Sequence, residues 1–429
     1  MILEFKIKNY LSFKDEVTFS FEATADTTLD EYYVREIVPG VRVLKLGIIY
    51  GANASGKSNL ISAFDFLSLF IRKNRQDKSE ETEFVPFMFG KTKDEPGRFE
   101  LTFYVDTRKF IYSFVMDAQT VFDEALYFYP GTQPALVFHR YFDKEKELSI
   151  VEFGSKIKIS KAAKNEIQIK TLKNISFFAA SQQVNYTIPD VIKDVRYWFD
   201  NQFLNSINPE TRLTDYTSRK IKDDELLKKF AMDFLQKAEF NITDVLYKTE
   251  FQKVPENILK MLEGSNLPEE EKKKIIEERG FVNEDTEFEH TIIEDGNRVK
   301  YTLPESLQSD GTMRYYGLSG PYYKMLQNEA FLTIDEIESS MHALLVNHFI
   351  KEFLMNRIES KRAQLLVTTH NLSLLNEKDI LRKDAIWFTS KQENGSTSLY
   401  SMADFDIRKE LSFYNAYKLG KFGAIPNLD

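Results

Sequence analysis

The sequence predicts an α/β fold with a mixed sheet at its core, and three observations lead to that prediction. An apolar run at residues 46–50 is followed by a loop that contains two glycines, a lysine and a serine. Beyond the loop, apolar residues recur at helical spacing as far as residue 71. Further buried-looking strands at 330–334 and 362–368 alternate with helical segments, which is typical of a mainly parallel sheet.

Composition places the chain among globular proteins. Its 429 residues allow two domains, or one large domain with an insertion, and 42% are hydrophobic. The absence of cysteine excludes disulfides and thiolate chemistry and fits a reducing cytoplasm. The N-terminus alternates like a strand, with no signal pattern, and no apolar run approaches the roughly 18 residues of a membrane helix. We therefore expect a soluble cytoplasmic protein that does not contact membranes.

The first 154 residues predict one lobe. Residues 1–22 read as two strands, and after a polar stretch the glycine-rich loop with its strand and helix occupies residues 46–71. Alternating apolar residues then recur in three segments separated by turn residues. These segments are 99–106, 109–117 and 125–130. Such alternation favours an antiparallel sheet, so we assign residues 1–154 to an N-terminal lobe with an antiparallel β subdomain.

The middle of the chain has a different pattern of residue types. Residues 155–286 mix charged and apolar residues and predict a mainly helical insertion, with helices at 225–238 and 268–280. Six lysines lie between residues 155 and 174. Because no aromatic residues interleave with them, a solvated face is favoured over a contact with nucleic acid or a partner.

The remainder of the chain predicts a second lobe. A hairpin is expected at 287–303, around a turn at 294–297, and strands and helices alternate from there to residue 391. We assign residues 287–429 to a C-terminal lobe that completes the same α/β core.

The glycine-rich loop has the spacing G-x-x-x-x-G-K-[ST], the Walker A pattern. Its backbone amides surround the phosphates of a nucleotide, and the start of the next helix adds partial positive charge. A turn that matches by accident is disfavoured, because a strand and a helix flank the loop as the motif requires. The predicted nucleotide-binding residues are Gly51, Asn53, Ser55, Gly56, Lys57, Ser58 and Asn59. ATP is the expected ligand.

Two later strands end in side chains that suit phosphate chemistry. Asp335 and Glu336 follow the strand at 330–334. We expect Asp335 to hold magnesium together with the hydroxyl of Ser58, and Glu336 to be the general base for the attacking water. His370 follows the strand at 362–368 and is placed to contact the γ-phosphate or that water. The five histidines lack the spacing of a metal cage, so Mg²⁺ is the only metal expected.

Residues 308–326 place Ser309, Gly311 and Thr312 at the start of another helix. Within one chain this helix start has no phosphate to bind, because the Walker A loop already encloses the nucleotide. In a head-to-head dimer it would face the nucleotide of the partner subunit. The pattern therefore predicts that these three residues contribute to nucleotide binding across a dimer interface.

The order of these motifs resembles the ABC-type ATPase heads of the SMC, Rad50 and RecF kind. A closer resemblance is to the OLD-like ATPases of bacterial anti-phage and abortive-infection systems, including RloA- and AriA-type proteins. That resemblance extends over most of the chain and is weakest from about 155 to 285. Beyond the motifs above, it rests on Ile7–Phe13, the Pro-Phe pair at 86–87, the Ser-Met-His stretch at 340–342 and Tyr417–Pro426.

The resemblance implies an AAA ATPase with an ABC-type head that binds ATP and Mg²⁺ and closes into an ATP-dependent dimer, or a higher oligomer. It also implies a sensor, scaffold or regulator of a separate effector, such as a TOPRIM or other nuclease, because no TOPRIM segment follows the ATPase motifs in this sequence. Two alternatives stay open. One is an ATPase that acts directly on DNA in repair or chromosome maintenance, against which stand the net charge of −9 and the lack of a long coiled coil. The other is an assembly platform that seldom hydrolyses ATP, against which Glu336 argues.

Overall fold

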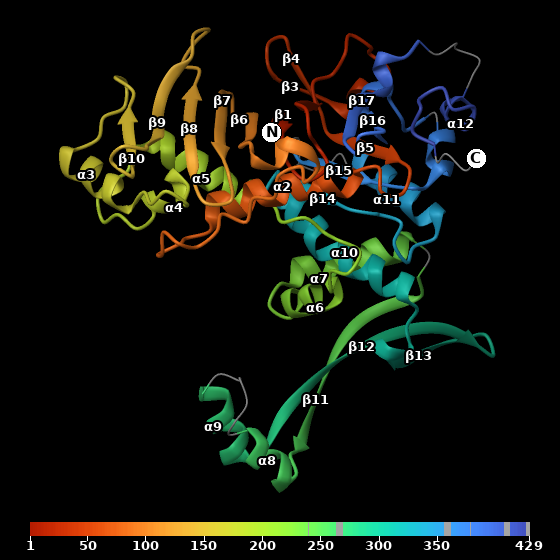
Figure 1. Cartoon of the computed structure of the whole chain (residues 1–429). Helices are drawn as coiled ribbons and strands as arrows, with labels where there is room; N and C mark the ends of the chain where they lie inside the picture. Colours follow the sequence, from red (N-terminus) through yellow and green to blue (C-terminus); the bar gives the residue numbers. More distant parts are fainter. Residues whose placement is uncertain (239, 263–268, 356–361, 378, 407–411, 426–429) are drawn as a thin grey trace. The chain divides into compact units, whose positions relative to one another are not determined.

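The structure is a computed structural model that describes residues 1–238, 240–262, 269–355, 362–377, 379–406 and 412–425. The chain folds into two compact units, each described below by itself. The first combines Met1–Thr211 with Lys324–Asp429, and the second is Arg212–Tyr323 (Figure 1).

A five-stranded mixed sheet lies at the centre of the first unit, in the order β14-β15-β5-β16-β17. Its strands are β5 (Leu46–Gly51), β14 (Phe331–Ile334), β15 (Gln364–Thr368), β16 (Ile386–Lys391) and β17 (Thr397–Ser401). The first four strands in this order run parallel, and only β17 is antiparallel. Every residue of β5 is buried, which explains why its sequence is an uninterrupted apolar run. The carboxyl ends of β5, β15 and β14 therefore lie at one edge of the sheet.

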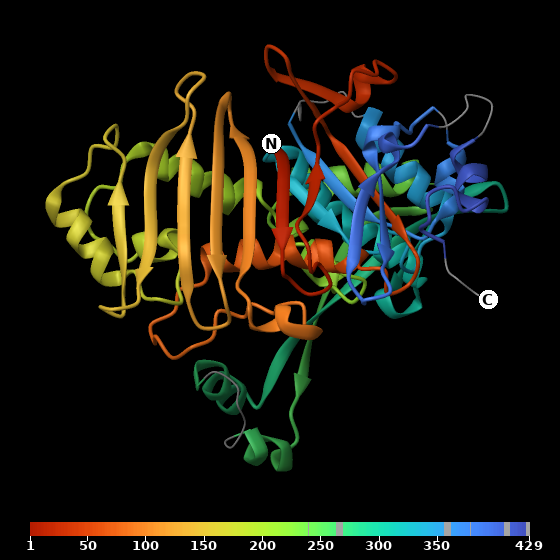
Figure 2. The ribbon, with the colours of Figure 1, turned by 45° about the horizontal axis from the view of Figure 1, so that its top comes forward.

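A seven-stranded antiparallel sheet forms the other layer, in the order β10-β9-β8-β7-β6-β1-β2 (Figure 2). Its strands are β1 (Ile2–Lys8), β2 (Val17–Ser20), β6 (Gly97–Val105), β7 (Arg108–Met116), β8 (Val121–Phe128), β9 (Ala135–Asp143) and β10 (Leu148–Phe153). The predicted combination of a mixed α/β core with an antiparallel β subdomain is confirmed.

Helix α2 (Lys57–Arg72), which follows the Walker A loop, packs against both sheets. The ring of Phe64 lies with its centroid 4.5 Å from that of Phe5 in β1 and 5.0 Å from that of Phe331 in β14. All three rings are almost completely buried. This aromatic contact fixes α2 between the two layers and so fixes the position of the loop at its start.

Residues 155–211 belong to the first unit, so the structural boundary differs from the expected start of the insertion at residue 155. The reason is a buried ion pair between Glu124 of β8 and Arg140 of β9. Glu124 accepts from the amide of Phe177 at 2.9 Å, and Arg140 donates to the carbonyl of Leu172 at 2.8 Å. These bonds tie the following segment to the antiparallel sheet. Its helices are α3 (Lys161–Lys170), α4 (Phe177–Ser181) and α5 (Asp190–Gln202).

The second unit combines helices with a three-stranded antiparallel sheet in the order β11-β12-β13 (Figure 1). Its elements are α6 (Leu213–Ile221), α7 (Glu225–Lys237), β11 (Ile242–Lys253), α8 (Glu256–Leu262), α9 (Glu269–Glu278), β12 (Gly280–Glu294), β13 (Asn297–Pro304), η2 (Glu305–Leu307) and the start of α10 (Asp310–Gln327). The predicted hairpin is present, and its turn lies at 295–296. The helical expectation for residues 242–253 was wrong, because they form β11 and pair with β12.

Shorter elements complete the first unit. They are α1 (Asp30–Tyr33), β3 (Val34–Val38), β4 (Val41–Leu44), η1 (Gly90–Asp94), α11 (Ala343–Met355), η3 (Leu372–Asn376), η4 (Lys383–Ala385), η5 (Met402–Asp404) and α12 (Phe413–Lys418). None of the helices in the described ranges is long and apolar enough to cross a membrane.

Candidate nucleotide-binding site

The Walker A loop joins β5 to α2 in a conformation that requires glycine. Gly56 has φ +104°, and a Cβ atom there would lie 2.3 Å from Oγ1 of Thr397. At Gly51, a Cβ atom would lie 2.4 Å from Oγ1 of Thr389. No side chain caps the start of α2, and its first turn carries no acidic residue. The amides of that turn are therefore available to an anionic ligand, as phosphate binding at a helix start requires.

Lys57 lies against the loop that it follows. Its side chain is buried, and Nζ donates to the carbonyls of Gly51 at 2.9 Å and Ala52 at 3.0 Å. Burial lowers the pKa of the Lys57 ammonium, and the carboxylates of nearby acidic residues oppose that shift. Those residues are Asp335, Glu336 and Glu338. The electrostatic coupling places the Walker A lysine and the predicted acids in one site.

Asp335 follows β14 directly and is 7% exposed. The hydroxyl of Thr368, at the end of β15, donates to Oδ1 of Asp335. The same hydroxyl accepts from the amide of Glu336 at 2.8 Å. Two neighbouring strand ends are thus joined through one side chain, which sets the direction of the Asp335 carboxylate.

Glu336 has a strained backbone and an unengaged side chain. Its φ of +46° lies in the left-handed region, which is uncommon for a residue with a Cβ atom and concentrates at functional sites. Within the described residues, the Glu336 carboxylate has no hydrogen-bond partner, and the side chain is half-buried. A carboxylate without competing donors is available to accept a proton from water.

The other predicted residues of the loop have different surroundings. Asn53 and Ser58 are exposed. Ser55 is buried and shares a hydrogen bond of 2.6 Å with the hydroxyl of Thr389, and Asn59 donates to Oγ of Ser12 at 2.7 Å. The side chains of Ser55 and Asn59 therefore brace the loop.

Sequence reasoning missed three residues that hold the loop in shape, Ser12, Thr389 and Thr397. The Thr397 hydroxyl hydrogen-bonds to Oγ of Ser12 and to the carbonyl of Ser55, both at 2.8 Å. Thr389 lies beside Gly51 in the ladder between β16 and β5. Among these three residues, the sequence pointed only to Ser12, which lies in the Ile7–Phe13 stretch of the family resemblance. Thr389 and Thr397 could not be found in this way, because β16 and β17 contain no recognised motif.

His370 follows β15, at the edge of the sheet where Asp335 also lies. Its backbone amide donates to the carboxylate of Glu338, and Thr369 donates its hydroxyl to the same carboxylate at 2.8 Å. The residue is exposed. The structure thus brings the loop, Asp335, Glu336 and His370 to the carboxyl ends of three neighbouring strands.

Ser309, Gly311 and Thr312, here called the signature residues, lie in the second unit at the start of α10. Ser309 caps this helix: its Oγ accepts from the amide of Thr312 at 3.1 Å and lies 2.6 Å from the Thr312 hydroxyl. Gly311 lies in the first turn between them. The helix start expected from the sequence is therefore present, and the contribution of these residues to a nucleotide site across a dimer stays a prediction.

The site suits magnesium. Ser58 supplies a hydroxyl and Asp335 a carboxylate, which are the hard oxygen donors that Mg²⁺ prefers. In the part of the chain that the structure describes, no group of three or more His, Asp or Glu side chains forms a metal cage. A metal bound with few protein ligands and the phosphates of a nucleotide fits this donor set.

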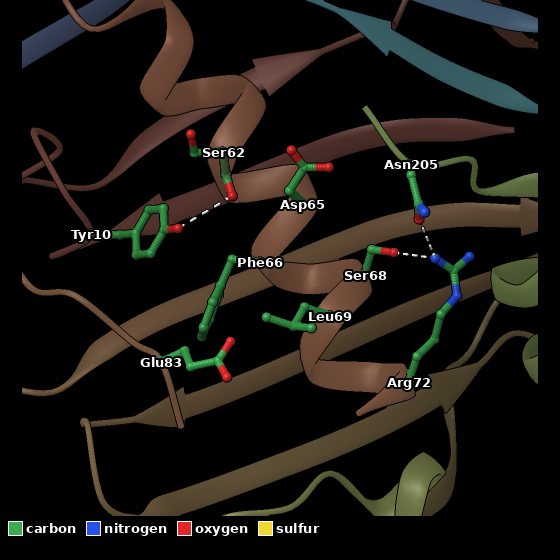
Figure 3. A pocket seen from close by; sticks show the side chains of 9 residues that line it. All are labelled: Tyr10, Ser62, Asp65, Phe66, Ser68, Leu69, Arg72, Glu83 and Asn205. Carbon is green, nitrogen blue, oxygen red and sulfur yellow. Dashed lines mark hydrogen bonds between the residues drawn. The ribbon is translucent and has the colours of Figure 1, made fainter. Parts of the chain in front are cut away.

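A pocket of about 550 Å³ opens along α2 beyond the loop (Figure 3). Asp65 and Arg72 line it from this helix, and Asn205 lines it from the segment after α5. Asp65 accepts from the amide of Ser206 at 3.1 Å. Burial raises the pKa of the Asp65 carboxyl, hydrogen bonds from Ser206 oppose this, and the charge of Asp335 adds to it. The wall of the pocket thus lies within electrostatic range of the predicted metal ligand.

A glycine-rich loop between a buried strand and a helix, with two acidic residues at the end of a nearby parallel strand, defines a P-loop ATPase. A family model described as "AAA domain, putative AbiEii toxin, Type IV TA system" matches residues 47–376, which is more than half of the chain. The chain belongs to this AAA domain family. Its fold is a P-loop fold with a mixed α/β core and an antiparallel β subdomain, as the sequence predicts.

Two solved structures are similar to the chain. The SMC head domain from Thermotoga maritima has 13% sequence identity and a TM-score of 0.42, over 95% of this chain and 99% of that one. An SMC head bound to the C-terminal winged-helix domain of ScpA has 14% identity and a TM-score of 0.40, over 97% of this chain and 99% of that one. No curated protein matched the sequence.

Proposed function

We propose that this protein binds and hydrolyses ATP at the site formed by the Walker A loop, Asp335, Glu336 and His370. The amides at the start of α2 and the ammonium of Lys57 hold the phosphates. Ser58 and Asp335 hold magnesium, which supplies charge neutralisation when bound. Glu336 accepts the proton of the attacking water, and His370 orients that water or the γ-phosphate.

One observation carries this proposal. No side chain caps the start of α2, and the Glu336 carboxylate has no hydrogen-bond partner within the described residues, while hydrogen bonds hold the groups around them. A site whose supports are satisfied and whose reactive groups are open is preorganised for a ligand. A loop with a purely structural role would have no reason to keep these groups open.

We further propose that two copies close head to head around two ATP molecules. Ser309, Gly311 and Thr312 of one chain would then complete the site of the other. Support comes from the order of the motifs in the sequence and from α10, which begins directly after Ser309 as the sequence predicts. Hydrolysis would remove the γ-phosphate between the two halves and loosen the dimer.

For the biological role, we propose a bacterial anti-phage or abortive-infection ATPase of the OLD-like group that regulates a separate effector. The family description, which includes a type IV toxin–antitoxin system, supports a role in this kind of defence. The second unit supports the regulatory part of the proposal, because it is a separate compact unit whose strands β11 and β12 and helices α8 and α9 contain none of the Walker A residues and neither Asp335 nor Glu336.

The test has a biochemical and a cellular arm. Phosphate release from ATP is measured for the purified protein and for Glu336→Gln, and phage plating is measured in bacteria that carry the gene with its neighbours. Loss of both activities in Glu336→Gln supports the proposal. Hydrolysis stimulated by DNA, with no effect on phage plating, would instead favour an ATPase that acts on DNA.

A further inference from the structure

Glu338 is the third acidic residue near Lys57, and it is engaged differently from the other two. Its Oε2 accepts from the hydroxyl of Thr369 at 2.8 Å, and its Oε1 accepts from the backbone amide of His370. Both oxygens therefore bind consecutive residues of the segment after β15. Thr369 is fully buried, whereas Glu338 is half-buried.

The sequence D-E-I-E does not show which of Glu336 and Glu338 acts as a base and which holds the neighbouring segment, but their hydrogen bonds differ. A general base needs a lone pair that faces water, and the Glu336 carboxylate has no partner among the described residues. The lone pairs of Glu338 are directed to two donors of the neighbouring segment. Glu338 is thus built to hold that segment in place.

We propose that Glu338 is a positioning residue, which fixes His370 relative to the turn that carries Asp335 and Glu336. This inference rests on the proposed ATP hydrolysis. Glu338 and its two donors, Thr369 and His370, form a clasp between the ends of β14 and β15. The clasp thereby limits how far the histidine can move relative to Glu336, and such positioning is what attack on a bound phosphate depends on.

Within the described part of the chain, the other hydrogen bonds of residues 369–371 do not connect His370 to the turn after β14. The amide of Thr369 donates to the carbonyl of Ile49 in β5 at 3.1 Å, and the hydroxyl of Tyr50 donates to the carbonyl of Asn371 at 3.2 Å. These bonds fix the residues on either side of His370 to the central strand. The bond from the His370 amide is directed to Glu338, so it ties the histidine to the turn after β14 that carries Asp335 and Glu336.

The test uses Glu338→Gln, which keeps the size of the side chain but replaces one acceptor oxygen with an amide group that opposes a donor. We expect kcat for ATP hydrolysis to fall about tenfold to a hundredfold, as for a misplaced catalytic group, while the Kd for ATP stays unchanged. In a His370→Ala background the same substitution should lower kcat no further, because the group that it positions is absent. Independent, additive losses in the two variants would overturn the inference.

A readout that does not depend on activity separates this inference from the proposed function. In hydrogen–deuterium exchange, Glu338→Gln should increase exchange in a peptide that contains His370 and leave peptides of the Walker A loop unchanged. If the wild-type protein fails to hydrolyse ATP but exchange increases as expected, the clasp stands and the proposed function falls. Unchanged exchange would overturn the clasp.

Thr369→Val provides a second variant should Glu338→Gln fold poorly. It removes one of the two bonds to Glu338 and keeps the shape of a buried side chain, so we expect a smaller loss of kcat in the same direction. Thr171→Val is the matched control, because it removes a buried threonine hydroxyl that donates to the carbonyl of Ile167 in α3 and does not contact Glu338. A loss of kcat in Thr369→Val accompanied by a larger Kd for ATP would contradict a positioning role.

Discussion

The hydroxyl of Thr368 donates to the carboxylate of Asp335 and accepts from the backbone amide of Glu336. One buried side chain of β15 thus orients the proposed metal ligand Asp335 and the proposed base Glu336, which both follow β14. Partners of this kind tune metal sites almost as strongly as the ligands themselves.

We predict that Thr368→Val raises the magnesium concentration needed for half-maximal hydrolysis by about tenfold, because the Asp335 carboxylate loses its orienting donor. The variant should also unfold more readily, by about 1–3 kcal/mol, because a buried amide loses its acceptor. Magnesium titrations of the ATPase rate and denaturant unfolding measure the two effects. Thr368→Ser keeps the hydroxyl and is the control; an unchanged magnesium requirement in Thr368→Val would contradict the assignment.

Lys57→Ala is expected to abolish ATP binding, because it removes the cation that reaches the β- and γ-phosphates. Calorimetric titration with ATP measures the affinity. Lys73→Ala is the matched control: Lys73 lies just beyond the same helix, is exposed and pairs with Glu83. Equal affinities for the Lys57→Ala variant and the wild type would exclude this loop as the nucleotide site.

Glu336→Gln should bind ATP with normal affinity and hydrolyse it about 10²- to 10⁴-fold more slowly, because the amide keeps the shape and loses the basicity. The trapped state should be visible as ATP that stays bound after gel filtration. If this variant turns over ATP at the wild-type rate, another residue must act as the base.

Gly51→Ala tests the close approach between the loop and β16. The added Cβ atom would lie 2.4 Å from Oγ1 and 2.6 Å from the carbonyl oxygen of Thr389, and the carbonyl cannot rotate away. We expect a destabilisation of about 1–3 kcal/mol, as for other overpacked sites, and weaker ATP binding. Gly131→Ala, in open space on an exposed turn, should change neither quantity. Equal unfolding midpoints for the two variants would show that the loop relaxes freely.

The proposed dimer makes a prediction for mixed chains. Lys57→Ala and Ser309→Arg should each be inactive alone, because every composite site then lacks either its lysine or its signature serine. A mixed dimer keeps one complete site, formed by Lys57 of the second variant and Ser309 of the first, so hydrolysis should recover on mixing. No recovery in dimers shown to be mixed would rule out a shared site.

The residues that sequence reasoning located are those whose chemistry depends on local spacing. The loop at 51–58 and the acids after 330–334 lie next to apolar runs, so pattern alone placed them at strand ends. The braces could not be found in this way. Ser12 and Thr397 are far apart in the sequence and meet only because β17 folds back beside β2 and the loop.

Strand β11 of the second unit was missed for a different reason. In β11, acidic and basic residues interrupt the apolar ones in a manner that also suits a helix. The register with β12, which no local pattern encodes, makes this segment a strand.

The chain crosses between its two units twice, and both crossings lie next to β14, the strand that precedes Asp335. Residues 203–207 run alongside β14, where the carbonyl of Ile207 accepts from the amide of Asp335 at 2.8 Å, and the second unit begins at Arg212. On the return, α10 ends at Gln327 and β14 starts at Phe331. The phosphate loop, by contrast, is anchored to β16 and β17 on the other side of β5. Both covalent connections to the second unit therefore adjoin the strand that precedes Asp335, whereas the phosphate loop is braced from the opposite side of β5.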